Sequence, residues 1–373
     1  MHCPHFIAAR CRSCSWIERA YADQLEAKQT LAQARIQGPR LRWLAPLASV
    51  ESGFRNKAKM AVGGSCEAPV LGLVDLQDRA VDLADCLLYP EAIQRAFGPL
   101  RDLIQTARIA PYSLQERRGE LKYLLLTIAP DGALLLRLVL RSREPLSRIE
   151  KHLPALRAAL PDLGPISINL QPEHKAVLEG DIELMLPGPD SLRIELNGIP
   201  LHLKPRSFFQ THTTLAAALY ARAAAWIQAA RPERLLDLYC GVGGFALHCA
   251  PHAGSVVGRE ISAEAIASAE LSRAEIGLAN TRFEVADASR GDALDGAPDA
   301  LIVNPPRRGI GAELCAAIEA SEVRTLVYSS CNVDSLAADL AQLPSFQPIE
   351  AQVLDLFPHT AHFETLVLLK RGV

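Results

Sequence analysis

The chain has 373 residues, of which 49% are hydrophobic, and this length is enough for two ordinary domains with cores of their own. No apolar run approaches the ~20 residues that a membrane-spanning helix needs, and the first residues lack the apolar stretch of a secretion signal. The formal net charge of −3 argues against a uniformly basic nucleic-acid binder, and we expect a soluble cytoplasmic protein.

The first half of the chain is predicted to form a mixed α/β domain over residues 1–205. A helix is expected over 24–36, and later apolar segments are expected as strands over 123–128, 134–140, 166–170, 182–186 and 192–196. Residues 1–205 carry 26 Lys and Arg against 23 Asp and Glu, whereas residues 206–373 carry 13 against 19. A surface that binds an acidic partner is therefore expected in the first half.

The second half is predicted to form a separate α/β domain over residues 206–373. After a helix over 213–229, short apolar segments alternate with helical ones, and strands are expected over 234–239, 255–260, 281–285, 300–304 and 324–329. Buried strands joined by helices predict a Rossmann-like parallel sheet. Two last strands, over 350–357 and 363–370, are joined by a short connection and should be antiparallel. By fold analogy, this ending is typical of the seven-stranded methyltransferase sheet.

Polar residues follow several of these strands, at the edge where ligands bind in a doubly wound sheet. A glycine-rich turn over 237–245 follows the first strand, and Glu260 ends the second, where its carboxylate can accept hydrogen bonds from ribose hydroxyls. Asp287 could face an adenine amine, and Asn304 ends the fourth strand. No Gly-Lys-Ser/Thr phosphate loop is present, which favours S-adenosylmethionine, a cofactor without phosphate.

Cys331 follows the fifth strand at this edge and is the predicted nucleophile. A thiolate that adds to C6 of a uracil makes C5 reactive enough to accept a methyl group, and a base must then remove the C5 proton. An ordinary thiol is mostly protonated at neutral pH, so the site should favour ionisation. The alternative is a buried, inert cysteine, which is the favoured interpretation for Cys240, Cys249 and Cys315.

Glu364 begins the last strand, which brings it to the same edge as Cys331, and it is the candidate general base. His359 and His362 are the alternative candidates for the general base. For both, a supporting or structural role is the favoured interpretation. Asn304-Pro305-Pro306 is followed by Arg307 and Arg308, whereas amino-group methyltransferases have an aromatic residue after a similar motif. This departure favours methylation of carbon. A DNA cytosine enzyme is the chemical alternative, but its nucleophile usually follows the fourth strand.

The motifs at 207–210, 237–245, 304–309, 329–332 and 357–364 together resemble the RNA 5-methyluridine methyltransferases. The resemblance implies that Cys331 is the nucleophile and Glu364 the base. It also implies four positions that contact S-adenosylmethionine: Gln210, Tyr239, Glu260 and Asn304. Tyr239 stands where Phe is more usual, which should preserve stacking.

Four cysteines of the first half form a candidate metal site: Cys3, Cys11, Cys14 and Cys86. Their spacing alone fits either zinc or an iron–sulfur cluster. The resemblance implies a [4Fe-4S] cluster, with Cys66 left over.

Within the family, the resemblance is closest to members that methylate uracil-747 of 23S rRNA, since the chain starts directly at its cysteines without a preceding barrel. Two alternatives remain open: a tRNA or other rRNA target, and a non-catalytic RNA-binding iron–sulfur protein. The candidate RNA contacts are the basic segments 55–59 and 117–122, and either Phe208 or Phe209 could stack on a flipped base. The alternative interpretation of the two basic segments is that they only keep the surface solvated. We expect a monomer without a protein partner.

Overall fold

The computed structural model describes residues 1–75, 78–174, 177–290 and 294–372. The chain forms two compact units, one of Met1–Arg12 with Ser52–Ile194 and the other of Ser13–Glu51 with Glu195–Val373. The predicted boundary at residue 205 therefore differs from the observed division, because residues 13–51 pack with the C-terminal unit. In the described part of the chain, no helix combines the length and apolar character needed to cross a membrane.

The first unit is built around a seven-stranded sheet of order β4-β3-β2-β5-β6-β7-β8. Its elements are α1 (Pro4–Ile7), β2 (Lys57–Gly64), β3 (Pro69–Val74), β4 (Ala80–Asp82), α3 (Glu91–Thr106), β5 (Leu121–Ile128), β6 (Leu134–Leu140), α4 (Leu146–Ala159), β7 (Leu163–Leu170) and β8 (Ile182–Met185). Alternate residues of the strands enter one core with the apolar faces of α3 and α4, as the period of two along a strand requires. The predicted strands of this half are confirmed, whereas α1, β2, β3, β4, α3 and α4 were not predicted.

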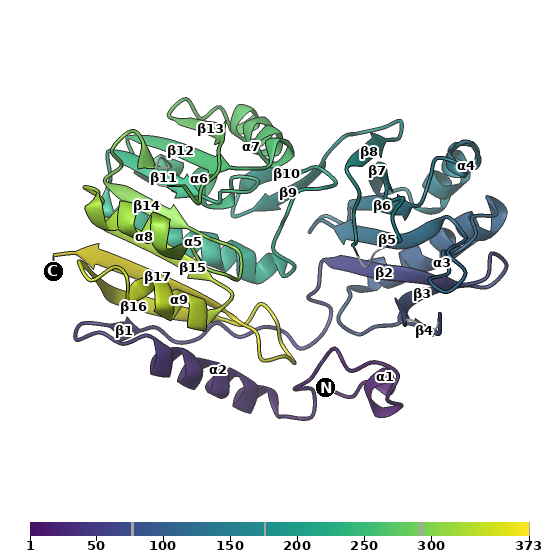
Figure 1. The fold of residues 1–373 in the computed structure, drawn as a ribbon, viewed down its shortest axis with the longest axis horizontal. Helices are drawn as coiled ribbons and strands as arrows, with labels where there is room; N and C mark the ends of the chain where they lie inside the picture. The colour runs from purple at the N-terminus through teal and green to yellow at the C-terminus, as the bar shows by residue number, and fades with distance from the viewer. Residues whose placement is uncertain (76–77, 175–176, 291–293, 373) are drawn as a thin grey trace. The chain divides into compact units, whose positions relative to one another are not determined.

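The second unit holds the Rossmann-like sheet (Figure 1). Its elements are α2 (Tyr21–Arg35), β1 (Arg42–Trp43), β10 (Ile199–Leu203), α5 (Thr213–Ala230), β11 (Arg234–Leu238), α6 (Gly244–Cys249), η1 (Ala250–His252), β12 (Ser255–Glu260), α7 (Ala263–Ile276), β13 (Thr281–Val285), β14 (Ala300–Val303), α8 (Gly311–Ala320), β15 (Thr325–Ser330), α9 (Val333–Leu340), β16 (Phe346–Leu354) and β17 (Glu364–Arg371). A short strand, β9 (Leu192–Leu196), pairs with β10 apart from the main sheets.

The main sheet of this unit has the order β1-β16-β17-β15-β14-β11-β12-β13. Strands β11 to β15 are parallel, and β17 runs antiparallel to both β15 and β16, which confirms the predicted C-terminal hairpin. All residues of β14 and β15 are buried, as expected of strands covered on both faces. The sheet has eight strands, so the expected seven are extended by β1, which pairs in parallel with β16.

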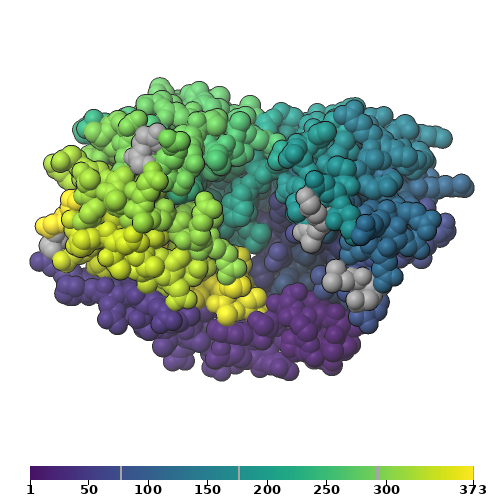
Figure 2. Space-filling view, viewed as in Figure 1, coloured from purple at the N-terminus to yellow at the C-terminus, as the bar shows by residue number. Residues whose placement is uncertain are grey.

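The N-terminal segment that joins this unit is held by polar contacts as well as by β1. The Lys28 ammonium of α2 donates to Asp355 Oδ1 at 2.7 Å, and both side chains are fully buried. In the space-filling view, the early residues of α2 and β1 lie against the late residues of the C-terminal strands (Figure 2). The contacts with residues 13–51 therefore help to fix the position of the segment after Asp355, which leads to the start of β17.

Replacing Asp355 by alanine is expected to lower the free energy of unfolding by about 3–5 kcal/mol, because it leaves the Lys28 charge buried without its partner. Urea unfolding measures the change. The matched control is Asp334→Ala, which removes the exposed partner of Arg35 and should cost at most about 1 kcal/mol. Equal costs for the two variants would contradict the structural role of the buried pair.

Candidate active site

The glycine-rich turn after β11 is shaped by backbone conformations with positive φ. Gly241 and Gly243 have φ of 54° and 84°, and Tyr239 shares the left-handed region at 60°. A Cβ on Gly243 would lie 2.8 Å from the Phe283 ring, so only glycine fits this close approach. The buried Asp237 carboxylate accepts a hydrogen bond from the backbone N–H of Ala246 at 2.9 Å and fixes the turn against α6.

Glu260 lies beside this turn, at the end of the neighbouring strand β12. Its carboxylate accepts hydrogen bonds from the backbone N–H groups of Gly241 at 3.3 Å and Ser262 at 3.0 Å. The backbone N–H of Asn304 reaches the Leu238 carbonyl at 3.4 Å, so Asn304 also borders the turn. Together the turn, the carboxylate and the amide form a polar edge suited to a nucleoside.

The remaining predicted cofactor positions differ in exposure. Tyr239 is half-buried, and burial raises the pKa of its hydroxyl to about 12, so it stays neutral as an aromatic surface. Gln210 and Phe209 are buried in the segment before α5, whereas Phe208 is 68% exposed. The exposed Asp287 accepts hydrogen bonds from the backbone and hydroxyl of Ser289, and these hold its pKa below the ordinary value.

Cys331 and Glu364 meet at the carboxyl ends of the parallel strands. Ser330 of β15 pairs with Thr365 of β17, which sets the residue after one strand beside the residue that begins the other. Burial raises the pKa of the Cys331 thiol, and the neighbouring Glu364 carboxylate raises it further. The structure therefore brings together the two residues that the sequence assigned to nucleophile and base.

The Glu364 carboxyl is almost completely buried and accepts a hydrogen bond from the Ser329 hydroxyl. Burial raises its pKa to about 7, and the Ser329 hydrogen bond opposes that shift. A carboxylate with a pKa near neutral pH can take up a proton during a reaction and return it to water afterwards.

Arg307 lies beside Cys331, and the sequence indicated it only as a departure from another motif. Its charge lowers the pKa of Cys331, in opposition to burial and Glu364. The guanidinium contacts His362 Nδ1 at 3.0 Å, and the Asn332 side chain donates to the Arg307 carbonyl at 2.9 Å. A basic residue at the same sheet edge as a candidate thiolate is the signal that could have identified it.

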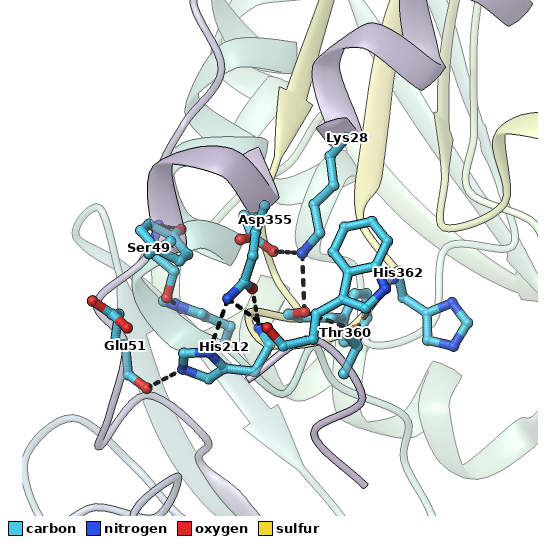
Figure 3. A network of polar contacts seen from close by, with 12 residues as sticks. Lys28, Ser49, Glu51, His212, Asp355, Thr360 and His362 are labelled. Atoms are coloured by element: carbon cyan, nitrogen blue, oxygen red, sulfur yellow. Dashed lines mark hydrogen bonds and ion pairs between the residues drawn. The ribbon is translucent and has the colours of Figure 1, made fainter. Parts of the chain in front are cut away.

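His359, for which a supporting or structural role was expected, is held by contacts to distant segments of the chain. It is fully buried, its Nε2 lies 2.8 Å from the Glu51 carbonyl, and its backbone N–H donates to Gln24 at 2.8 Å. Glu51, which accepts this contact, belongs to a polar network that also contains Lys28, Asp355, Ser49 and His212 (Figure 3). These contacts fix the loop between β16 and β17, and thereby the position of Glu364.

The expectation that the site favours ionisation of Cys331 differs from the observed direction, because burial and Glu364 together raise its pKa. Glu364→Gln removes a negative charge, so it should lower the pKa of Cys331 and speed its alkylation by iodoacetamide at pH 7. Arg307→Gln should act in the opposite direction. Mass spectrometry of the Cys331 peptide across pH measures both variants, and shifts of equal sign would contradict this electrostatic account.

Cys240, Cys249 and Cys315 are buried, and burial raises the pKa of each thiol, as expected for inert residues.

Cys3, Cys11 and Cys86 lie in the first unit, where the first two are near enough to raise the pKa of the third, while Cys14 belongs to the second unit. Within the described ranges, no three His, Cys, Asp or Glu side chains are arranged to hold a metal ion.

Comparison with known proteins agrees with this geometry. A family model described as tRNA (Uracil-5-)-methyltransferase matches residues 292–372, and one described as methyltransferase small domain matches residues 215–320. The 23S rRNA (uracil(747)-C(5))-methyltransferase RlmC of Halothiobacillus neapolitanus is 48% identical over 377 residues, and that of Cronobacter sakazakii is 46% identical over 374, with 100% of each chain covered.

Among solved structures, the Pyrococcus abyssi tRNA (uracil-54, C5)-methyltransferase in complex with S-adenosyl-L-homocysteine aligns with a TM-score of 0.80. The alignment covers 95% of this chain and 85% of that chain at 24% identity. At this level of identity the likeness is one of fold, and it agrees with the methyltransferase sheet of the second unit.

Proposed function

Because the chain belongs to the family of 23S rRNA (uracil(747)-C(5))-methyltransferases, we propose that it transfers a methyl group from S-adenosylmethionine to C5 of a uridine in 23S rRNA, at uracil-747. The observation that carries the proposal is the pairing of Cys331 with Glu364 at the active edge of the sheet. A nucleophilic thiol beside a base of near-neutral pKa is the pair that carbon methylation of uracil requires.

In the proposed reaction, Cys331 is the nucleophile and Glu364 is the base. The Cys331 thiolate adds to C6 of the uracil, and the electron pair of the C5–C6 double bond makes C5 nucleophilic. S-adenosylmethionine would supply the methyl group from its sulfonium, whose S–CH3 bond breaks and whose sulfur leaves as the neutral thioether of S-adenosylhomocysteine. After C5 is methylated, the Glu364 carboxylate removes the C5 proton, the double bond re-forms, and the thiolate leaves C6. The proton then passes from Glu364 to solvent, and both residues are regenerated.

Four residues are proposed to bind S-adenosylmethionine. The Glu260 carboxylate is held by the turn and suits the ribose hydroxyls, and the neutral Tyr239 ring offers a surface for the adenine. Asn304, which borders the turn, and the buried Gln210 are proposed to complete the set and to contact the target base as well. Asp287 keeps its place as the candidate partner of the adenine amine, although its carboxylate is bonded to Ser289 here.

The RNA target is tested by mapping 5-methyluridine in rRNA and tRNA from a strain that lacks the gene, with and without a plasmid copy. Loss at position 747 of 23S rRNA, restored by the plasmid, is the expected result. If only tRNA loses 5-methyluridine, the substrate assignment is wrong while the chemistry stands. If neither RNA loses it, the catalytic function itself is contradicted, and a non-catalytic RNA-binding role takes its place.

An iron–sulfur cluster held by Cys3, Cys11, Cys14 and Cys86 is part of the proposal. Thiolates are the ligands that such clusters use, and the electrostatic coupling of Cys3 and Cys11 with Cys86 supports three of the four ligands. The His5 imidazole lies 2.6 Å from Asp85, next to Cys86, which ties the segment that carries Cys3 to the one that carries Cys86. Zinc is the alternative occupant of the same four thiols.

Protein purified without oxygen is expected to be brown and to contain iron and acid-labile sulfide. Cys86→Ser should lose the iron, whereas Cys66→Ser, a change at a half-buried cysteine of the first unit that is not a proposed ligand, should retain it. Metal analysis and the visible absorption spectrum measure the difference. A colourless preparation that contains zinc and no iron would contradict the cluster.

A further inference from the structure

The first unit contains a cavity of about 370 Å³ that the proposed chemistry does not use. Strands β2, β3 and β5, which lie side by side in the sheet, form its floor together with the segment after α3. Along β2, Ala58 and Met60 enter the core beneath the helices, so the intervening Lys59 and Ala61 belong to the opposite face. The cavity therefore opens on the face of the sheet that α3 and α4 leave uncovered.

Small residues line part of the cavity. Ala61 pairs with Gly72 on one side and with Tyr123 on the other, so a glycine and an alanine stand in a row beside an aromatic ring. A Cβ on Gly72 would lie 2.1 Å from the Val81 carbonyl oxygen, so no larger residue fits there. The volume is within the ~300–1,000 Å³ range of ligand pockets and suits a single nucleoside better than a helix or a peptide.

Two lysines from different segments converge on this cavity. Lys59 belongs to the basic segment 55–59 and Lys122 to the basic segment 117–122, both of which the sequence indicates as RNA contacts. The exposed Lys59 ammonium has no ion-pair partner among the residues that the structure describes, so its charge is available to a phosphate.

Lys122 has a different role because it is built into the wall. Its ammonium donates to the Gln171 side chain and to the Glu173 carbonyl, and it lies 4.5 Å from the centre of the Tyr112 ring. The Tyr112 hydroxyl lies 3.0 Å from His174 Nδ1, so the ring is held at its hydroxyl as well as over its face. The half-buried Tyr123 gives the cavity an aromatic wall above an apolar floor, and the buried Tyr112 contributes only its edge.

We propose that this cavity is an RNA subsite that binds one unpaired nucleotide of the substrate outside the methylated position, with its base against Tyr123 and its phosphate at Lys59. Aromatic rings beside positive charge are the usual means by which proteins bind unpaired bases. The subsite rests on the proposed function, because it needs an RNA substrate. It holds the RNA while Cys331 and Glu364 act on another nucleotide.

Steady-state kinetics on a 23S rRNA fragment that contains the target uridine test the subsite. Tyr123→Ala should raise the KM for RNA about 10-fold with kcat unchanged, and Tyr123→Phe should retain the wild-type KM. Ala61→Leu fills the hollow and leaves every aromatic and charged group in place, so it should act like Tyr123→Ala. Lys59→Ala should raise KM about 3-fold and reduce the salt slope of RNA binding by about 1.

The matched control is Lys151→Ala, which removes an exposed lysine from α4 on the covered face of the same unit and should leave KM unchanged. RNA that carries 4-thiouridine at single unpaired positions should crosslink to the peptide of Tyr123 from one position other than the target.

Two results would contradict the subsite and leave the proposed function intact, provided that the wild-type enzyme methylates the RNA. One is that the variants have the same KM as Lys151→Ala, and the other is that no crosslink reaches the Tyr123 peptide. If the wild-type enzyme methylates no RNA, the proposed function and the subsite fall together.

Discussion

Replacing Cys331 by alanine is expected to lower methyl transfer to the RNA by about 10⁴-fold or more, because the variant lacks the only group proposed to add to C6. Cys331→Ser tests the same point with a side chain of nearly the same shape, since a hydroxyl is far too weak an acid to replace the thiolate. Both variants should still bind S-adenosylmethionine and RNA, because Cys331 lies at the end of β15, apart from the turn after β11.

RNA with 5-fluorouridine at the target position identifies the nucleophile directly. The fluorine leaves no C5 proton to remove, so the wild-type enzyme and S-adenosylmethionine should form a stable covalent adduct with this RNA. Cys331→Ala should form none, whereas Cys66→Ala, a change at a half-buried thiol of the first unit, should form the adduct at the wild-type rate. An adduct that persists in Cys331→Ala would assign the nucleophile to another residue.

The second sheet was predictable because its signals are local. Short buried strands that alternate with helices predict a parallel sheet, and the rule that ligands bind at carboxyl strand ends then brings Glu260, Asn304 and Cys331 to one edge. The short connection between the last two strands predicts an antiparallel pair, and that pair sets Glu364 beside Cys331. Each step needs only sequence spacing and the geometry of a doubly wound sheet.

The assignment of residues 13–51 to the second unit was not predictable in this way. Helix α2 buries Gln24 and Lys28, both polar, so its sequence gives no apolar stripe that would indicate a packed face. Its partners, Asp355 and His359, lie more than three hundred residues later in the chain. Contacts between polar side chains at such a separation follow no periodic pattern, so only the folded structure reveals them.

The pKa of Cys331 likewise depends on contacts between residues that are far apart in the sequence. The sequence indicates a thiol that must ionise, but the sign of its pKa shift depends on which charges lie beside it. Glu364 raises that pKa and Arg307 lowers it, and the two residues reach Cys331 from different strand ends. The pairing of Arg307 with His362 belongs to the same set of unpredicted contacts.

Replacing Glu364 by glutamine is expected to lower turnover by about 10²–10⁴-fold, the usual contribution of a general base. The variant keeps the thiol and should still methylate C5, but it cannot remove the C5 proton. A covalent complex between enzyme and methylated RNA should therefore accumulate with ordinary, unfluorinated RNA, at the level of one per active site. Denaturing gels and mass spectrometry of the RNA-linked Cys331 peptide measure the complex.

The pH dependence of turnover gives a second test of Glu364, because the carboxylate is the active form of the base. Burial raises its pKa to about 7, so turnover should rise as the pH increases through that value. Ser329→Ala removes the hydrogen bond that opposes this shift and should move the rise to higher pH without trapping RNA. His362→Asn is the matched control for the competing base. If that variant traps the methylated complex and Glu364→Gln does not, the base is His362, and Glu364 serves only to hold the edge of the sheet.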